Sequence, residues 1–340
     1  MKLANESKTT DIQMIRNRRQ FLLQATAIGA SPLLANAHLD DKKKAQIVIT
    51  YDLEMSRHYP KRGMTEWDYQ KGNLDDATKE YSLESAKRIS DLGGKIHYFC
   101  VGRVLEQSDI SWLTDINELG HPIGNHTYDH VNVTAKTAAQ TQFRFQRSPW
   151  LVQGKTAFEI ILENIRLAEI ALQERAGIKC NGFRTPGGFY KGLQDSPEIR
   201  KLLMALGYEW ISSKYPPHQS ERGDDGVKES VYENIVAAQK NAQPFRYDND
   251  LLEIPMSPIS DVTAFRSKFW QLDEFKHAIK RSVMWAIETG GVFDFLCHPS
   301  CMVIEDPKFE TILMMADLVK QHSDRAELVT LDKVADRYKS

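Results

Sequence analysis

Near the amino end of the chain lies the stretch Ile47-Val48-Ile49-Thr50-Tyr51-Asp52-Leu53-Glu54, a short apolar run rich in β-branched residues that closes on two acids. Such a run is typical of a parallel strand buried on both faces. Side chains two residues apart on a strand point to the same side, so Asp52 and Glu54 are expected to share one face at the carboxyl end of this strand.

Further along, two histidines stand four residues apart beside a glycine-bearing turn, in Gly120-His121-Pro122-Ile123-Gly124-Asn125-His126-Thr127-Tyr128-Asp129-His130. On a helical turn this spacing puts both imidazoles on one side, within reach of an ion about 2.0–2.1 Å from each nitrogen. A catalytic metal needs three protein ligands and one open position for water. The spacing therefore predicts a metal site in which a strand-end carboxylate joins His126 and His130, while His121 supports the turn.

Strands and helices are expected to alternate through the rest of the chain. The apolar patterns predict helices at 83–92, 110–119, 157–176, 199–206 and 275–289, and strands at 95–101, 208–212, 252–255 and 291–297. Long insertions at 56–81, 136–155 and 215–250 carry aromatic residues that either contact a substrate or anchor the loops. With chemistry at the carboxyl ends of strands, this order predicts a barrel-like (β/α) fold.

Composition argues for a globular protein without a nucleic-acid partner. Hydrophobic residues make up 41% and charged residues 26% of the 340, which is ordinary for a folded domain. The net charge is −2, and no basic stripe is present that would bind a phosphate backbone. The four cysteines are irregularly spaced and are expected to be free thiols.

The first 37 residues have the features of an export signal. Asn17-Arg18-Arg19-Gln20-Phe21-Leu22-Leu23 resembles a twin-arginine pattern, and Ala35-Asn36-Ala37 has the form of a cleavage site. The apolar stretch between them is interrupted by polar residues and falls short of the roughly 20 residues that a membrane span needs. We expect a signal at 1–37, a linker at 38–44, a catalytic domain at 45–335, no stable membrane span after processing, and a periplasmic or cell-envelope location.

Two further blocks complete a pattern of four: Phe183-Arg184-Thr185-Pro186-Gly187-Gly188 and Phe293-Asp294-Phe295-Leu296-Cys297-His298-Pro299. Together the four blocks resemble the polysaccharide deacetylases with a NodB homology domain, carbohydrate esterase family 4. The resemblance covers roughly residues 45 to 305. It implies a distorted (β/α) barrel and a metal-dependent hydrolase that removes N-acetyl groups from a polysaccharide or amino-sugar polymer and releases acetate.

The resemblance also implies roles for the acids and the histidine pair. The family's adjacent Asp-Asp is replaced here by Asp52-Leu53-Glu54, and by matching positions Glu54 is the metal ligand and Asp52 the general base. Exchange of these two roles stays open. With His126 and His130 the donor set suits Zn²⁺, although Co²⁺ or another divalent ion fits the same ligands.

The remaining assignments come from the later blocks. Arg184 is implied to hold Asp52 ionised, and His298 to protonate the departing amine. We expect Tyr128 to lie at the substrate, with a backbone N–H near it for the oxyanion, and Pro186 and Trp210 to line the pocket. The family's acidic pair before tryptophan is absent around Trp210, so the acid that partners His298 is undetermined, with Glu253 and Asp294 as candidates by position.

Two other functions remain open. One is hydrolysis of another linear amide or ester, such as a ureide or an O-acetyl ester, because relatives of this fold include such enzymes. The other is an exported carbohydrate-binding protein without turnover, which the unusual Glu54 and the missing acidic pair would favour. Metal content together with acetate release would distinguish the three.

Overall fold

The computed structural model describes residues 43–57 and 71–339. The predicted signal at 1–37 lies outside these residues, as do Tyr59, Trp67 and Tyr69 of the first insertion. No helix within the described ranges is both long and apolar enough to cross a membrane.

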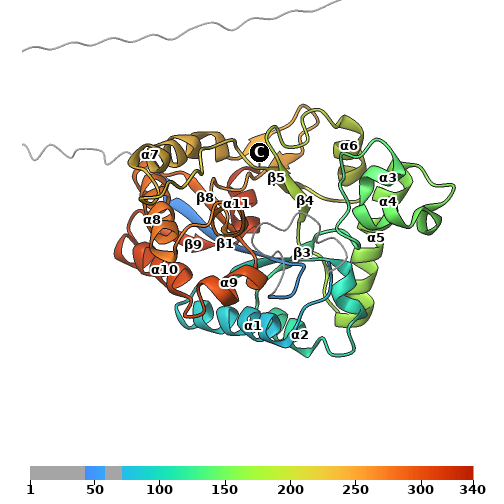
Figure 1. Ribbon diagram of the computed structural model, residues 1–340, viewed down its shortest axis with the longest axis horizontal. Coiled ribbons are helices and arrows are strands. Elements are labelled where there is room, and N and C mark those ends of the chain that lie inside the picture. The colour runs from blue at the N-terminus through green and yellow to red at the C-terminus, as the bar shows by residue number, and fades with distance from the viewer. Residues whose placement is uncertain (1–42, 58–70, 340) are drawn as a thin grey trace, which may run out of the picture. The chain divides into compact units, whose positions relative to one another are not determined.

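A curled sheet lies at the centre of the described chain, with helices packed around it (Figure 1). Its strands follow the order β6-β7-β5-β4-β3-β2-β1-β8, and β9 pairs with the first half of β1. All neighbouring strands are parallel except β6 and β7. The strands are β1 (Ala45–Leu53), β2 (Ile96–Cys100), β3 (Ile123–Asn125), β4 (Phe183–Phe189), β5 (Trp210–Lys214), β6 (Phe245–Arg246), β7 (Leu252–Glu253), β8 (Val292–Cys297) and β9 (Ala326–Val329). The predicted distorted (β/α) barrel is confirmed.

Helices connect most of these strands and cover the outside of the sheet. They are α1 (Asp76–Asp91), α2 (Ser111–Glu118), α3 (Ala138–Thr141), α4 (Phe143–Arg147), α5 (Ala157–Ala176), α6 (Pro197–Ala205), α7 (Glu229–Ala238), α8 (Leu272–Thr289), α9 (Pro299–Glu305), α10 (Glu310–Gln321) and α11 (Leu331–Arg337). Short 3₁₀ turns at Gly102–Glu106, Pro149–Val152 and Gln239–Ala242 and a π-helical turn at Val262–Ser267 complete the described elements.

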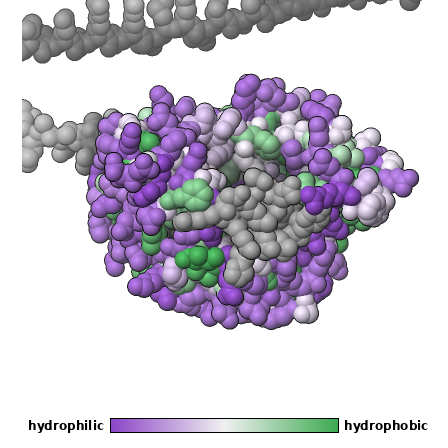
Figure 2. All heavy atoms as spheres, in the orientation of Figure 1, coloured by the Kyte–Doolittle hydropathy of each residue, from purple (hydrophilic) through white to green (hydrophobic). Residues whose placement is uncertain are grey.

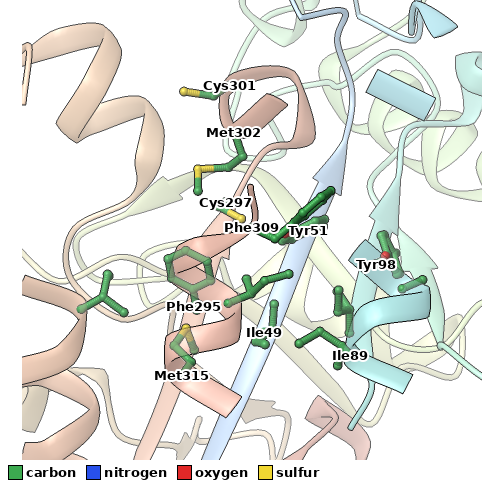
Figure 3. Packing of buried hydrophobic residues seen from close by; sticks show 14 of the residues in the cluster. Ile49, Tyr51, Ile89, Tyr98, Phe295, Cys297, Cys301, Met302, Phe309 and Met315 are labelled. Atoms are coloured by element: carbon green, nitrogen blue, oxygen red, sulfur yellow. The ribbon is translucent and has the colours of Figure 1, made fainter. Parts of the chain in front are cut away.

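Strand β1 divides the core in two because its side chains alternate. Ile49 and Tyr51 point outward into the large cluster beneath α1, α8 and α10, where they pack with Phe295, Cys297 and Met315 (Figure 3). The intervening residues of β1 point to the inside of the barrel, where Val48 belongs to a separate apolar cluster with Phe99 and Trp210. Asp52 and Glu54 continue this inner set, as their spacing predicts.

Most predicted elements are present, and the largest difference lies at α1. This helix begins at Asp76, seven residues before the predicted start, because the Asp75 side chain accepts a hydrogen bond from the Thr78 N–H and caps it. The first turns are mostly polar, so periodicity alone could not reveal them. The third insertion also contains α7, which the sequence analysis did not predict.

The four cysteines are free, as expected, and three of them are buried. Cys297 and Cys301 lie in the core beside Met302 (Figure 3). The coloured face of the described residues in Figure 2 is largely hydrophilic, with only scattered apolar patches.

Buried His97 makes the free energy of unfolding depend on pH. Burial lowers its pKa to about 3, against the opposing effect of its hydrogen bond to the Asn181 carbonyl. The folded protein therefore favours the neutral ring, so this contribution to stability is complete above the unfolded pKa of about 6.5 and is lost as the pH falls toward 3.

We predict that His97→Phe reduces the slope of unfolding free energy against pH between 6.5 and 4 by up to about 1.4 kcal/mol per pH unit. Denaturant titrations at several pH values measure it. His277→Gln, at an exposed histidine on α8, is the matched control. An unchanged slope in His97→Phe would show that this ring does not titrate on unfolding.

Candidate active site

Arg184 occupies the centre of the barrel with no exposed side-chain surface. Its guanidinium donates to Asp52 Oδ1 at 3.1 Å and to Asp294 Oδ2 at 2.6 Å, and it lies over the Phe99 ring. The guanidinium also donates to the hydroxyls of Thr50 and Ser212. Burial raises the pKa of Asp294 to about 6 although Arg184 opposes this shift. Arg184 therefore joins β1, β4, β5 and β8, and it contacts Asp52 as the resemblance implied.

The two histidines lie in an irregular turn after β3, so the predicted helical placement is wrong. Thr127 and His130 have left-handed backbones, with φ of 60° and 59°. The Asn125 side chain accepts from the Thr127 N–H at 2.7 Å, and the Thr127 hydroxyl accepts from the Val131 N–H at 3.0 Å. These local bonds stabilise a turn in place of a helix and still bring both imidazoles together, with ring centroids 5.0 Å apart.

His126 lines the cavity, and its ring is oriented by a backbone carbonyl. Its Nδ1 lies 3.0 Å from the Arg184 carbonyl oxygen, to which it can only donate, so Nε2 is left as the atom with the lone pair. Nε2 is buried and has no hydrogen-bond partner. A buried, unsatisfied acceptor whose ring is oriented through its other nitrogen is the usual arrangement of a metal-binding histidine.

Glu54, His126 and His130 form a cluster that fits a divalent metal. Their ligand atoms all lie within 4.8 Å of one another, and Glu54 Oε2 is 2.6 Å from His130 Nε2 and 3.7 Å from His126 Nε2. Burial alone would raise the pKa of Glu54, but Lys71 and His130 outweigh it and hold that pKa well below its usual range. Two imidazoles and an ionised carboxylate suit zinc and similar ions.

Sequence reasoning missed Lys71, which belongs to the same cluster. Its ammonium donates to Glu54 Oε2 at 2.6 Å and lies 3.3 Å from His130 Nε2, with the side chain almost fully buried. No spacing rule relates Lys71 to the acids of β1 or to the histidine turn. The one signal in the chain is the following Gly72, which permits the sharp turn there.

His298 follows β8 and pairs with Asp261, a residue that no sequence motif singled out. Asp261 accepts from the His298 backbone N–H at 2.8 Å and from Nδ1 at 2.9 Å. The earlier candidates are wrong: Asp294 binds Arg184, and Glu253 binds Ser213 and the Tyr247 hydroxyl. Although burial lowers the pKa of His298, the carboxylates of Asp261, Glu54 and Asp52 together raise it to about 9.

These groups face a cavity of about 210 Å³ at the carboxyl ends of the strands. Its described lining includes the acids, the histidines and Lys71, with a second wall made by β4 and by the segments after β5 and β7. The lining residues are Asp52, Glu54, Met55, Lys71, His126, His130, Thr185, Gly187, Gly188, Tyr215, Met256, Ser260, Val262, Thr263, Leu296 and His298. His298 Nε2 lies 3.3 Å from Glu54 Oε1 and 4.0 Å from Asp52 Oδ2, so these three side chains meet at the cavity.

The three residues expected at the substrate are not in this lining. The backbone N–H of Tyr128 itself donates to the Asn164 carbonyl at 3.0 Å, and its hydroxyl donates to Glu106, while an oxyanion contact from a backbone N–H near Tyr128 stays a prediction. Pro186 is buried within β4, between lining residues. Trp210 packs edge-on against His97 and Phe99 and lines a different pocket beside Gly182, which corrects its expected place at the site.

Residues 73–210 match the family model described as polysaccharide deacetylase. The matched range includes the histidine pair and Arg184 and leaves out Asp52, Glu54, Asp261 and His298. The matched range spans less than half of the chain. No curated protein matches the chain.

Solved structures with the same fold include two that cover most of the chain. A probable polysaccharide deacetylase from Pseudomonas aeruginosa PAO1 has a TM-score of 0.55 at 14% identity and covers 86% of this chain and 90% of its own. PuuE allantoinase has a TM-score of 0.54 at 13% identity, with coverage of 88% and 92%. At 13–14% identity these similarities show only that the chain has the same fold as the probable deacetylase and the allantoinase.

We predict that Arg184→Met lowers the free energy of unfolding by about 3–5 kcal/mol, because it leaves two buried carboxylates without their cation. Chemical denaturation measures this loss. Adding Asp294→Asn to that variant should recover part of it. The control is Asp195→Asn, which removes the exposed partner of exposed Lys191 and should cost less than about 1 kcal/mol. An equal loss in both variants would contradict a central role for Arg184.

Proposed function

We propose that this chain is a metal-dependent hydrolase that removes N-acetyl groups from a polysaccharide or amino-sugar polymer and releases acetate and a free amine. One observation carries the proposal: three metal-ligand side chains, two buried and one half-buried, share a cavity with a carboxylate and a histidine that can move protons. The polysaccharide deacetylase match over residues 73–210 supports the substrate class.

Glu54, His126 and His130 would hold the divalent ion, most favourably zinc. When bound, such an ion supplies a Lewis acid that polarises the acetamide carbonyl and lowers the pKa of a nearby water. The protein contributes orientation, because the Arg184 carbonyl fixes the ring of His126.

Asp52 is the proposed general base. Arg184 engages its Oδ1, while Oδ2 lies 3.6 Å from His126 Nε2 on the cavity side. The carboxylate can therefore accept the proton of an attacking water held between these groups. The contact with Arg184 restricts its rotation.

His298 is the proposed general acid, and Asp261 positions it. Because Asp261 accepts from Nδ1, Nε2 faces the cavity and can deliver its proton to the departing nitrogen. Protonation of that nitrogen allows the carbon–nitrogen bond to break with release of a neutral amine.

The twin-arginine pattern at Asn17–Leu23 supports a further proposal, that the enzyme is exported to the periplasm or cell envelope. An exported enzyme of this kind would meet N-acetylated envelope or extracellular glycans. Fractionation of cells that express the chain with Arg18 and Arg19 intact, or both changed to Lys, would test this route.

We predict acetate release from at least one N-acetylated glycan when the full chain is loaded with Zn²⁺. Asp52→Asn should lower kcat by about 10²–10⁴-fold, the usual contribution of a general base, while His277→Gln changes nothing. The panel also contains O-acetyl esters and a ureide. Turnover of those substrates alone would replace the proposed substrate class, and glycan binding without acetate release would establish a binding protein.

We predict that Asp261→Asn lowers kcat by about tenfold or more with little change in KM, because a positioned proton donor contributes roughly 10²–10⁴-fold. Steady-state kinetics on the substrate identified above separates kcat from KM. Asp332→Asn, on the remote helix α11, should leave both constants unchanged. A parallel rise in KM at constant kcat would place Asp261 in substrate binding instead.

A further inference from the structure

Lys71 is an unusual residue to find among metal ligands. Only 1% of it is exposed, and lysine is almost never fully buried unless it is paired. Its ammonium lies 2.6 Å from Glu54 Oε2 and 3.3 Å from His130 Nε2. It therefore contacts two of the three atoms that would bind the metal.

The backbone fixes this placement. The Gly72 N–H donates to the Glu54 carbonyl at 2.7 Å, which ties Lys71 to the end of β1. Gly72 has φ of +83°, and a Cβ there would lie 2.2 Å from the Cβ of Arg103. The Ser56 hydroxyl donates to the Asn73 carbonyl at 2.6 Å and closes the same turn. A turn that only glycine tolerates thus directs the lysine into the cluster.

An ammonium and a metal ion make incompatible demands on this cluster. The ammonium has three N–H donors and no lone pair, so it stabilises Glu54 by donating to it. A divalent ion would need the lone pairs of the same Glu54 Oε2 and of His130 Nε2, each at about 2.0–2.2 Å. Two positive charges bonded to one buried carboxylate oxygen repel each other strongly.

We infer that the Lys71 ammonium is a built-in counter-ion of the metal-ligand cluster, which neutralises Glu54 in the metal-free protein and competes with a divalent cation for Glu54 and His130. Metal binding then displaces the ammonium from the cluster. The protein binds metal more weakly than its donor set alone would allow, and its metal-free state is correspondingly more stable. The inference rests on the proposed metal site and is independent of the substrate.

The test measures Zn²⁺ affinity by competition with a chromophoric chelator, together with the melting temperature before and after metal addition. Lys71→Met should raise the affinity at least about tenfold, because a repelling charge leaves the site. The metal-free variant should melt lower than the wild type, and Zn²⁺ should raise its melting temperature by more.

Lys79→Met is the matched control, because Lys79 lies on α1 and pairs with exposed Asp76 at 3.4 Å. This variant should bind Zn²⁺ like the wild type. Lys71→Gln, which removes the charge but keeps a hydrogen-bond donor for Glu54, should also bind Zn²⁺ more tightly. Equal or weaker Zn²⁺ binding in both Lys71 variants would overturn the inference.

A measurement on the unaltered protein covers the case in which neither variant folds. Lys71 should resist an amine-reactive acylating reagent without metal and become reactive once Zn²⁺ is bound, as peptide mass spectrometry can follow. The same reactivity in both states would contradict displacement. Because no substrate is used in these assays, failure to release acetate would count against the proposed function alone.

Discussion

The buried guanidinium of Arg184 is the interaction on which the site depends. It binds Asp52 on β1 and Asp294 on β8, two strands that are neighbours in the sheet, from β4 on the other side of the barrel. A charge in this position is costly unless both carboxylates are present, and each carboxylate is costly without it. The ion network inside the barrel therefore links these strands and also holds Asp52, the proposed base, in place.

The cavity lined by Asp52, Glu54 and the histidines contains a second pairing of buried charges. Glu54 is buried, and a cation beside its Oε2 offsets the cost of burying its charge, in addition to the His298 ring near its Oε1. Lys71 is the cation beside Glu54 Oε2 in the metal-free protein, and a divalent metal ion would take its place in the active enzyme. In the inferred scheme the charge of Glu54 is balanced either by Lys71 or by a divalent ion. The free-energy difference between these two states sets the metal affinity.

Prediction from sequence succeeded where a local rule applied. Alternation along β1 correctly put Asp52 and Glu54 on one face, and the ends of parallel strands brought them to His126, His130 and His298. Prediction failed for Trp210, whose ring packs against His97 and Phe99. The local sequence pattern does not show which face of a short strand a large side chain will occupy.

The sequence by itself determined the alternation of strands and helices, the strand ends and the histidine pair, since periodicity and spacing act over a few residues, while the family resemblance singled out Glu54 as the third ligand. Only the tertiary structure decided that Asp261 orients His298, that Lys71 reaches Glu54, and that left-handed residues rather than a helix present the two histidines. Asp261 is 37 positions from His298 and Lys71 is 17 from Glu54. Such contacts arise from loop closure and packing, which leave no periodic signal in the chain.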